Sequence, residues 1–286
     1  MKGLILAGGN GTRLAPTTKV INKHLIPIYD KPMIYYPLSN LMVAGCKEII
    51  ILSTPTGVEQ IKNILNTGDS LGIKIDYIIQ ETASGIPSAI NECEKLLGSD
   101  DFWVNLGDNF IFGSLIQNIY EKASKEKNCC IFLKEVTDVS ELGCAVFNEN
   151  QLVKFQEKPK VKSKGFAVTG LYKFNDKFFE YYKNIKISDR GETEIVDILS
   201  QYLNENNLTY FTFGRGVSWI DAGTKNDLIK ISNFVNTFQE INSNLICSPE
   251  EIAFNKKLIS KESLINTVHE NYLNTEYGEK LINLFN

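Results

Sequence analysis

The 286-residue sequence lacks several features that would point to common classes of protein. It has only two histidines, and its six cysteines form no CxxC pair, so a zinc site built from Cys and His is not expected. There is no excess of positive charge, because 34 acidic residues outnumber 30 basic ones and give a formal net charge of −4. The composition therefore provides no overall field that would attract nucleic acid or an anionic membrane surface.

Long hydrophobic runs are also missing. Met1 and Lys2 lead directly into a short strand-like run that ends in glycine, and no apolar stretch has the length of a signal peptide or a membrane span. Together with the cysteine usage, this predicts a cytoplasmic protein that does not bind membranes. What is present, a hydrophobic content of 43%, is enough for a large buried core.

The first 130 residues alternate between short apolar runs and segments of helical periodicity. This alternation predicts a parallel, doubly wound α/β sheet, which binds its ligands at the carboxyl ends of the strands. The expected strands are Gly3–Ala7, Glu48–Ser53, Ile73–Ile79, Phe102–Leu106 and Cys130–Leu133, and the expected helices lie around Met33–Ala44, Gly57–Leu65 and Ile86–Leu97.

Beyond residue 130 the pattern changes to shorter strand-like pieces, which we expect to continue the same sheet and to fold over its ligand edge. These pieces are Ala145–Phe147, Leu152–Gln156, Ala167–Phe174 and Thr209–Gly214, with a helix near Glu192–Tyr202. Helical patterns then dominate from Lys225 to Phe234 and from Pro249 onward. We therefore expect a core over residues 1–240 and a helical portion over residues 241–286.

A glycine-rich turn follows the first expected strand. Gly8, Gly9 and Gly11 permit a positive φ and a close approach of the backbone to a ligand. Exposed N–H groups there would form an anion-binding concavity, to which Thr12 adds a hydroxyl and Arg13 a charged fork. The turn matches neither the dinucleotide fingerprint nor the P-loop. It suits a polyphosphate, although a tight turn with a surface arginine is the alternative.

Two aspartates each follow an apolar run that leads toward the ligand edge. Asp108 comes after Gly107, and Asp221 precedes Ala-Gly-Thr. Carboxylates in such places suit Mg²⁺, which takes oxygen ligands and bridges to substrate phosphates, although each could instead only cap a turn. Lys23, ten residues after Arg13, could add a second cation or could be solvated.

Three further charged residues lie in the second half of the sequence. Glu157 and Lys158 would point in opposite directions on an extended segment, so one could meet hydroxyls and the other a phosphate. Arg190 could supply another phosphate contact. A solvated strand end and ordinary helix-start chemistry are the respective alternatives.

Taken together, the motifs resemble those of the sugar-1-phosphate nucleotidylyltransferases, most closely the members that use a thymidine nucleotide and glucose 1-phosphate. The resemblance covers essentially the whole chain in the expected order. It rests on LAGGNGTRL (6–14), Lys23, YDKPMIYYPL (29–38), LGDN (106–109), EKP (157–159), AVTGLY (167–172), RGETEI (190–195), DAGT (221–224) and CSPEEIAF (247–254).

The resemblance implies an α/β, Rossmann-like nucleotidyltransferase core with a mixed, mainly parallel sheet and a C-terminal helical appendix. It implies a Mg²⁺-dependent homotetramer that converts dTTP and α-D-glucose 1-phosphate into dTDP-glucose and pyrophosphate, a precursor step for rhamnose-type deoxysugars. The implied mechanism is in-line attack of a sugar-phosphate oxygen on the α-phosphorus. Because that nucleophile is already an anion, alignment and charge stabilisation suffice without a general base.

Residue by residue, the resemblance implies catalytic, metal-binding and substrate-binding positions. The implied catalytic residues are Arg13, which would stabilise the departing pyrophosphate, Lys23, which would bind the α-phosphate, Lys158, which would bind the sugar phosphate, and Asp108. Asp108 and Asp221 would bind Mg²⁺. The substrate-binding residues are Gly8, Gly9, Gly11, Thr12 and His24 around the nucleotide, Gln80 and Gly85 at the pyrimidine edge, and Gly143, Glu157, Val168 and Arg190 around the sugar phosphate.

The sequence departs from the family pattern around the base and the sugar. His24 stands where the family usually has Gln, Pro87 and Ser88 replace Ala and Gln after Ile86, and Leu142 replaces a Tyr. A uridylyltransferase, or a transferase for another hexose 1-phosphate, is therefore an alternative within the same chemistry. A non-catalytic nucleotide-sugar sensor has less use for the metal and pyrophosphate residues. A nicotinamide-dependent dehydrogenase would need the dinucleotide fingerprint, which is absent.

Overall fold

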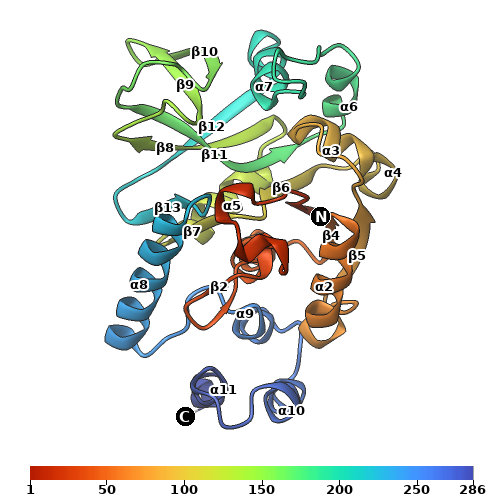
Figure 1. The fold of residues 1–286 in the computed structure, drawn as a ribbon, viewed down its shortest axis with the longest axis vertical. Helices are drawn as coiled ribbons and strands as arrows, with labels where there is room; N and C mark the ends of the chain where they lie inside the picture. Colours follow the sequence, from red (N-terminus) through yellow and green to blue (C-terminus); the bar gives the residue numbers. More distant parts are fainter. Residues whose placement is uncertain (286) are drawn as a thin grey trace.

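The structure, a computed structural model, describes residues 1–285 as one nine-stranded sheet and two small two-stranded sheets with helices around them (Figure 1). The strands are β1 (Lys2–Ala7), β2 (Pro27–Ile28), β3 (Lys31–Pro32), β4 (Glu48–Ser53), β5 (Lys74–Ile79), β6 (Phe102–Leu106), β7 (Asn109–Gly113), β8 (Cys129–Val136), β9 (Gly143–Asn148), β10 (Gln151–Glu157), β11 (Gly165–Phe174), β12 (Leu208–Phe213) and β13 (Val217–Asp221).

The α-helices flank the sheet and also make up most of the C-terminal part of the chain. They are α1 (Tyr35–Val43), α2 (Pro55–Leu65), α3 (Ile86–Glu92), α4 (Glu94–Leu97), α5 (Ile116–Lys125), α6 (Lys177–Tyr182), α7 (Ile195–Asn204), α8 (Lys225–Asn242), α9 (Pro249–Asn255), α10 (Lys261–Asn271) and α11 (Glu276–Ile282). Short 3-10 turns cover Thr12–Leu14, Thr17–Lys19, Lys23–Leu25, Asp69–Leu71 and Asn283–Phe285. Among the described residues, no helix is long and apolar enough to cross a bilayer.

The order of strands in the large sheet fixes where ligands can bind. Strands run in the order β10-β9-β11-β6-β1-β4-β5, with β8 beside β11 and β12 beside β8. From β5 to β6 neighbouring strands are parallel, whereas β11 is antiparallel to β6. The chain proceeds from β1 to β4 and β5 on one side and then returns to β6 on the other. The crevice of this switch point therefore lies at the carboxyl ends of β1 and β6.

Alternating side chains of the strands bury two separate hydrophobic layers, one on each face of the sheet. On β1, Leu4 points into the layer covered by α3, α4, α6 and α7, while Ile5 points into the layer covered by α1, α2 and α5. Both side chains have no solvent exposure. Burial on both faces explains why β1 and β4 read as continuous apolar runs in the sequence. The expected mixed α/β sheet, continued by the second half of the chain, is thus confirmed.

Several details of the secondary structure differ from expectation. The helix expected over Ile86–Leu97 is divided at Cys93 into α3 and α4, and the helix expected from Glu192 begins only at Ile195. Strands β7 and β13, and helices α5 and α6, were not predicted. β7 and β13 pair antiparallel with each other outside the large sheet, and this pairing of distant segments leaves little trace in local periodicity.

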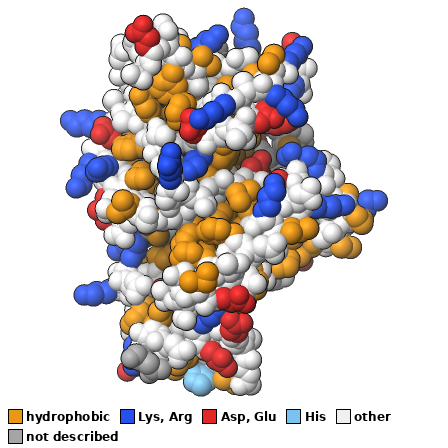
Figure 2. Space-filling model, turned by 90° about the vertical axis from the view of Figure 1, so that its left-hand side faces the viewer, with side chains coloured by type: hydrophobic (Ala, Val, Ile, Leu, Met, Phe, Trp, Pro, Cys, Tyr) orange, Lys and Arg blue, Asp and Glu red, His pale blue; other side chains and the backbone are white. Residues whose placement is uncertain are grey.

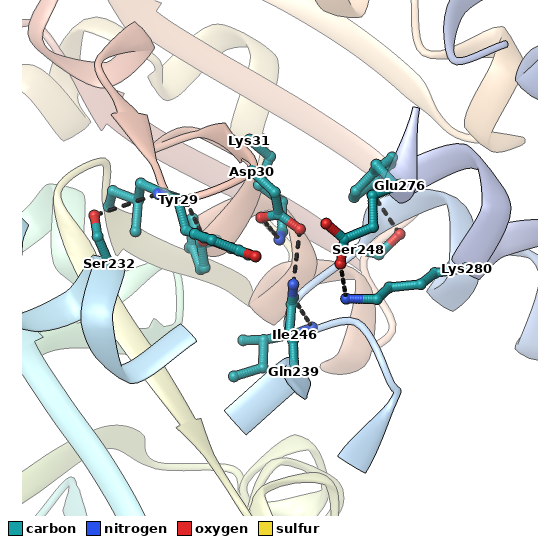
Figure 3. Close-up of polar contacts among 12 residues, drawn as sticks. Tyr29, Asp30, Lys31, Ser232, Gln239, Ile246, Ser248, Glu276 and Lys280 are labelled. Carbon is teal, nitrogen blue, oxygen red and sulfur yellow. Dashed lines mark hydrogen bonds and ion pairs between the residues drawn. The ribbon is translucent and has the colours of Figure 1, made fainter. Parts of the chain in front are cut away.

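Helix α8 joins the core to the C-terminal helices and continues to Asn242, so the expected boundary at residue 240 falls in its last turn. Figure 3 shows Gln239 of α8 between Asp30 and the backbone of Ile246. The Gln239 amide donates to Asp30 at 2.9 Å, and its carbonyl accepts from the Ile246 N–H at 2.8 Å. Asp30 in turn pairs with the buried ammonium of Lys31 at 2.5 Å. The C-terminal part is therefore tied to the β2–β3 hairpin.

Glu250 of α9 forms a second buried polar contact in the C-terminal part. Its side chain is 2% exposed and accepts hydrogen bonds from the hydroxyls of Tyr272 at 2.7 Å and Tyr277 at 2.6 Å, with Ser248 at 3.2 Å. We expect Glu250→Ala to lower the free energy of unfolding by about 3 kcal/mol, because it leaves these buried hydroxyls without their charged acceptor. Urea denaturation measures the change.

The matched control for Glu250→Ala is Glu262→Ala, which removes an exposed carboxylate from the first turn of α10. That substitution should change stability by less than about 0.5 kcal/mol. Equal denaturation midpoints for the two variants would show that the Glu250 contacts contribute nothing.

Candidate active site

A cavity of about 450 Å³ lies at the carboxyl ends of β1 and β6 and is lined by the glycine-rich turn. Gly8 packs so tightly on Gln80 that a Cβ at position 8 would lie 2.3 Å from Gln80 Oε1. Gly11 has a φ of 59° and starts the 3-10 turn that carries Thr12 and Arg13. A side chain at position 8 would displace the Gln80 amide, and the positive φ at position 11 favours glycine. The turn therefore forms an open cradle of backbone beside a buried amide.

The floor of this cavity carries Lys23 and His24, both buried. The Lys23 ammonium lies 2.5 Å from Asp108 Oδ2. His24 Nδ1 lies 3.0 Å from Asn22 Oδ1, so Nδ1 carries the proton and Nε2 is left as an acceptor. Burial, with Lys23 as a further cause, lowers the pKa of His24 to about 4 despite the nearby Asp108. His24 is therefore neutral at pH 7, and with Nδ1–H bonded to Asn22 it presents Nε2 as an acceptor.

Asp108 and Asp221 lie side by side because β7 pairs with β13. Asp221 is opposite Asn109, and the Ala222 N–H donates to the Asp108 carbonyl at 2.9 Å. Burial would raise the pKa of Asp108, but the charge and hydrogen bond of Lys23 outweigh it and hold the pKa below its usual value. Burial and the neighbouring Asp108 raise the pKa of Asp221 to about 6. The charge of Asp108 thus disfavours a second negative charge on Asp221.

The pair fits a divalent cation. Asp221 Oδ1 is buried without a hydrogen-bond partner among the described residues, so it has an oxygen lone pair to give. In residues 1–285 no group of three or more His, Cys, Asp and Glu side chains is arranged to hold a metal. A cation here would take two carboxylates and complete its shell with water and substrate oxygens, which is the usual arrangement for Mg²⁺.

A second cavity of about 1180 Å³ adjoins the first and shares Thr12 and Arg13 with it. Lys158 lines it from the end of β10, where a φ of 41° turns the chain. Arg190 also lines it, with its Nη2 atom 3.3 Å from Glu157 Oε1. Two cations therefore line this cavity, next to a carboxylate suited to hydroxyl groups.

Glu194 holds the guanidinium of Arg190 in place. Arg190 Nε donates to one carboxylate oxygen of Glu194 at 3.0 Å and Nη2 to the other at 2.5 Å, while Ser188 also donates to Glu194 at 2.7 Å. Burial would raise the pKa of Glu194, but these hydrogen bonds hold the pKa below its usual value. The pKa of Glu157 is raised, first by burial and then by Glu194.

The structure brings nearly all the sequence-predicted site residues to these two cavities. Gly143 does not line either cavity itself but pairs across β9 and β10 with Glu157, which lines the second. Val168 does not line either cavity, because its side chain is 8% exposed and packs in the hydrophobic layer that contains Leu4. The residues that sequence reasoning missed are Ser84, Thr193, Glu194 and Trp219, which line the cavities from loops and from β13. Thr193 and Glu194 lie within the motif RGETEI (190–195) but were given no role, whereas Ser84 and Trp219 lie outside every quoted motif.

Comparisons with known proteins agree with this geometry. The family model described as nucleotidyl transferase matches residues 2–237. The glucose-1-phosphate thymidylyltransferase of Neisseria meningitidis serogroup A is 38% identical over an alignment of 286 positions, which covers 99% of each chain. A Bacillus anthracis structure assigned as a glucose-1-phosphate thymidylyltransferase, in complex with sucrose, is 36% identical with a TM-score of 0.75 and covers 82% of this chain and 94% of its own. The structure of a UDP-glucose pyrophosphorylase in complex with UDP-glucose is 25% identical, with a TM-score of 0.73, and the match covers 83% of this chain and 98% of that one.

The chain therefore belongs to the nucleotidyl transferase family and is an enzyme of that class. Its full-length relatives, at 31–38% identity, carry the name glucose-1-phosphate thymidylyltransferase.

Proposed function

We propose that this chain is a glucose-1-phosphate thymidylyltransferase, which converts dTTP and α-D-glucose 1-phosphate into dTDP-glucose and pyrophosphate. The observation that carries the proposal is the pair Asp108 and Asp221 beside Lys23 and Arg13, at the junction of two cavities that share walls. One cavity suits the nucleotide and the other the sugar phosphate. Their junction is where an α-phosphorus and an attacking phosphate oxygen would meet.

The residues at the junction can align the reactants and stabilise charge. The glycine-rich turn would hold the triphosphate through its N–H groups, and Gln80 would meet the pyrimidine edge. Lys23 would neutralise charge on the α-phosphate, and Arg13 would stabilise the pyrophosphate as the bond to the α-phosphorus breaks. The sugar-phosphate oxygen that forms the new bond is already an anion, so no residue needs to remove a proton from it. Lys158 and Arg190 would keep that anion in line.

Asp108 and Asp221 would hold Mg²⁺, which would supply charge neutralisation of the triphosphate when bound. The donor set fits this role because both ligands are carboxylates and one of their oxygens is unsatisfied. Chelation of the metal by EDTA should therefore abolish pyrophosphate release, and added Mg²⁺ should restore it.

The test of the proposed function is a matrix of pyrophosphate-release assays. Each of dTTP, UTP, CTP, ATP and GTP is combined with glucose 1-phosphate and with other hexose 1-phosphates in the presence of Mg²⁺. We expect release to be fastest with dTTP and glucose 1-phosphate. Preference for UTP would instead assign the chain to uridylyl transfer, the chemistry of the UDP-glucose pyrophosphorylase with a similar fold. No release from any pair would contradict enzymatic transfer and favour a sensor.

The proposed role of Arg190 gives a prediction about affinity for the sugar phosphate. Glu194→Gln keeps the shape of the side chain but removes the charge that holds the guanidinium. We expect the KM for glucose 1-phosphate to rise by about tenfold, the equivalent of roughly 1.4 kcal/mol, with a smaller change in the KM for dTTP. Steady-state kinetics with each substrate varied in turn measures both.

The control for Glu194→Gln is Asp189→Asn, an exposed carboxylate in the same loop, whose loss should leave both KM values unchanged. An unchanged KM for glucose 1-phosphate in Glu194→Gln would remove Arg190 from the sugar-phosphate site.

We also propose a homotetramer in the cytoplasm. Figure 2 looks onto the side of the molecule on which α8 lies and shows hydrophobic side chains gathered in patches across it. Ile229 and Ile241 of α8 are 59% and 76% exposed, and a second copy could cover them. Light scattering should give a mass of four times 32.2 kDa. The cytoplasm suits a chain whose six cysteines are all free.

We further propose that residues 1–240 act as the catalytic core and residues 241–286 as a helical portion. The support is a separate small core in the latter, built from side chains of α10 and α11 together with Leu245.

A further inference from the structure

Thr193 and Glu194 form a bridge between the nucleotide cavity and the sugar cavity. They lie in the segment just before α7, where Glu194 has extended backbone angles, so their side chains point in opposite directions. Glu194 forms an ion pair with Arg190 on the side of the sugar cavity. Thr193 instead reaches the turn of residues 84–88 on the nucleotide side, more than a hundred positions away in the sequence.

Thr193 makes three hydrogen bonds to that turn, two of them to the same carbonyl oxygen. Its backbone N–H and its hydroxyl both donate to the Ser84 carbonyl at 3.0 Å. The same hydroxyl oxygen accepts from the Ser88 N–H in the first turn of α3 at 3.2 Å. The Thr193 side chain, 9% exposed, therefore closes the turn on both sides of Gly85.

Gly85 shows how closely the two segments meet. Its φ is 100°, and a Cβ at this position would lie 2.1 Å from the Thr193 carbonyl oxygen. Ser84 and Gly85 line the nucleotide cavity, whereas Thr193 and Glu194 line the sugar cavity. With no free space between the two walls, a shift of one wall must displace the other.

We propose that Thr193 is a positioning residue that couples the two cavities, so that binding of the nucleotide prepares the site for the sugar phosphate. The proposal rests on the proposed function, which assigns nucleotide and sugar phosphate to these cavities. A base held against the 84–88 turn fixes that turn. Through the Thr193 hydroxyl the turn fixes the segment whose next residue, Glu194, aims Arg190. Coupling of this kind is reciprocal, so the sugar phosphate must tighten nucleotide binding by the same factor.

The test compares the protein with its Thr193→Val variant, which keeps the shape of the side chain and removes the hydroxyl. Titration calorimetry gives the dissociation constant of glucose 1-phosphate alone and with saturating α,β-methylene-dTTP, an analogue that cannot release pyrophosphate. We expect the analogue to tighten sugar-phosphate binding about fivefold or more in the natural protein. In Thr193→Val the two dissociation constants should be equal.

Three further variants separate coupling from a structural role. Thr193→Ser restores the hydroxyl and should restore the coupling factor. Gly85→Ala should abolish the factor, because its Cβ forces the same two walls apart. Ser200→Ala removes a hydroxyl bonded at 2.7 Å to the Val196 carbonyl within α7, away from the turn, and should leave the factor unchanged.

Two results would overturn the coupling. One is a full coupling factor in folded Thr193→Val, and the other is equal dissociation constants already in the natural protein. Pyrophosphate release by the natural protein from dTTP and glucose 1-phosphate is measured alongside. Its absence contradicts the proposed function, whereas its presence together with either overturning result contradicts only the role of Thr193.

Discussion

Replacing Asp108 by Asn should lower kcat for pyrophosphate release by about a thousandfold while the protein stays folded. The substitution replaces one of the two carboxylates at the junction of the cavities by a neutral amide. It also removes the negative charge of Asp108 Oδ2, which lies 2.5 Å from the Lys23 ammonium. Both the cation site and the α-phosphate contact are therefore affected by one change. The measurement is kcat with saturating substrates, and the far-ultraviolet circular dichroism spectrum confirms the fold.

Asp76→Asn is the matched control for Asp108→Asn, because Asp76 forms an exposed ion pair with Lys74 on β5. Its loss should leave kcat unchanged, as expected for a surface pair. If Asp108→Asn turned over at a near-normal rate with Mg²⁺, Asp108 would have no part in the reaction.

Replacing Arg13 by Ala has the second-largest expected effect, a fall in kcat of about a hundredfold. The Arg13 side chain is exposed at the mouth of both cavities and lies close to Gly223, where a Cβ would be 2.9 Å from its Nη2 atom. It is therefore the cation placed to meet a departing pyrophosphate. Because Arg13 has little buried area, its loss should not lower stability, and the effect should lie in catalysis.

Arg13→Lys separates the charge from the forked geometry. A lysine keeps the positive charge but cannot donate in a bidentate manner, so it should recover only part of the lost rate. Arg215→Ala, which removes an arginine from the loop between β12 and β13, is the control and should behave like the natural protein. Full activity of Arg13→Ala would show that the leaving group is stabilised elsewhere.

The fold was predictable where local periodicity decides the structure. Strands β1, β4 and β6 are buried on both faces, and their continuous apolar runs were visible in the sequence. The pairing of β7 with β13 was not, because it joins Asn109 to Asp221 across more than a hundred residues. The expected start of α7 at Glu192 was wrong because the preceding residues stay extended to contact Ser84 and Arg190.

The site was predictable to the extent that its residues follow strands. Gly8 directly follows β1 and Asp108 lies in the turn after β6, so the topology of a doubly wound sheet brings them together. Positions that depend on tertiary contacts could not be placed. Val168 was assigned to the sugar through a motif, but it points into the hydrophobic layer, and Thr193 acts through Ser84, to which no sequence pattern connects it.

The most direct measurement of the central claim follows the oxygen atoms of the transfer. Glucose 1-phosphate labelled with ¹⁸O in its phosphate is incubated with dTTP, Mg²⁺ and the purified protein. The ¹⁸O content of each product is then measured by mass spectrometry. In-line attack of the sugar phosphate on the α-phosphorus predicts dTDP-glucose that retains all of the label and pyrophosphate that carries none. Labelled pyrophosphate, or thymidine monophosphate formed with no dTDP-glucose, would contradict nucleotidyl transfer at the junction of Asp108, Asp221, Lys23 and Arg13.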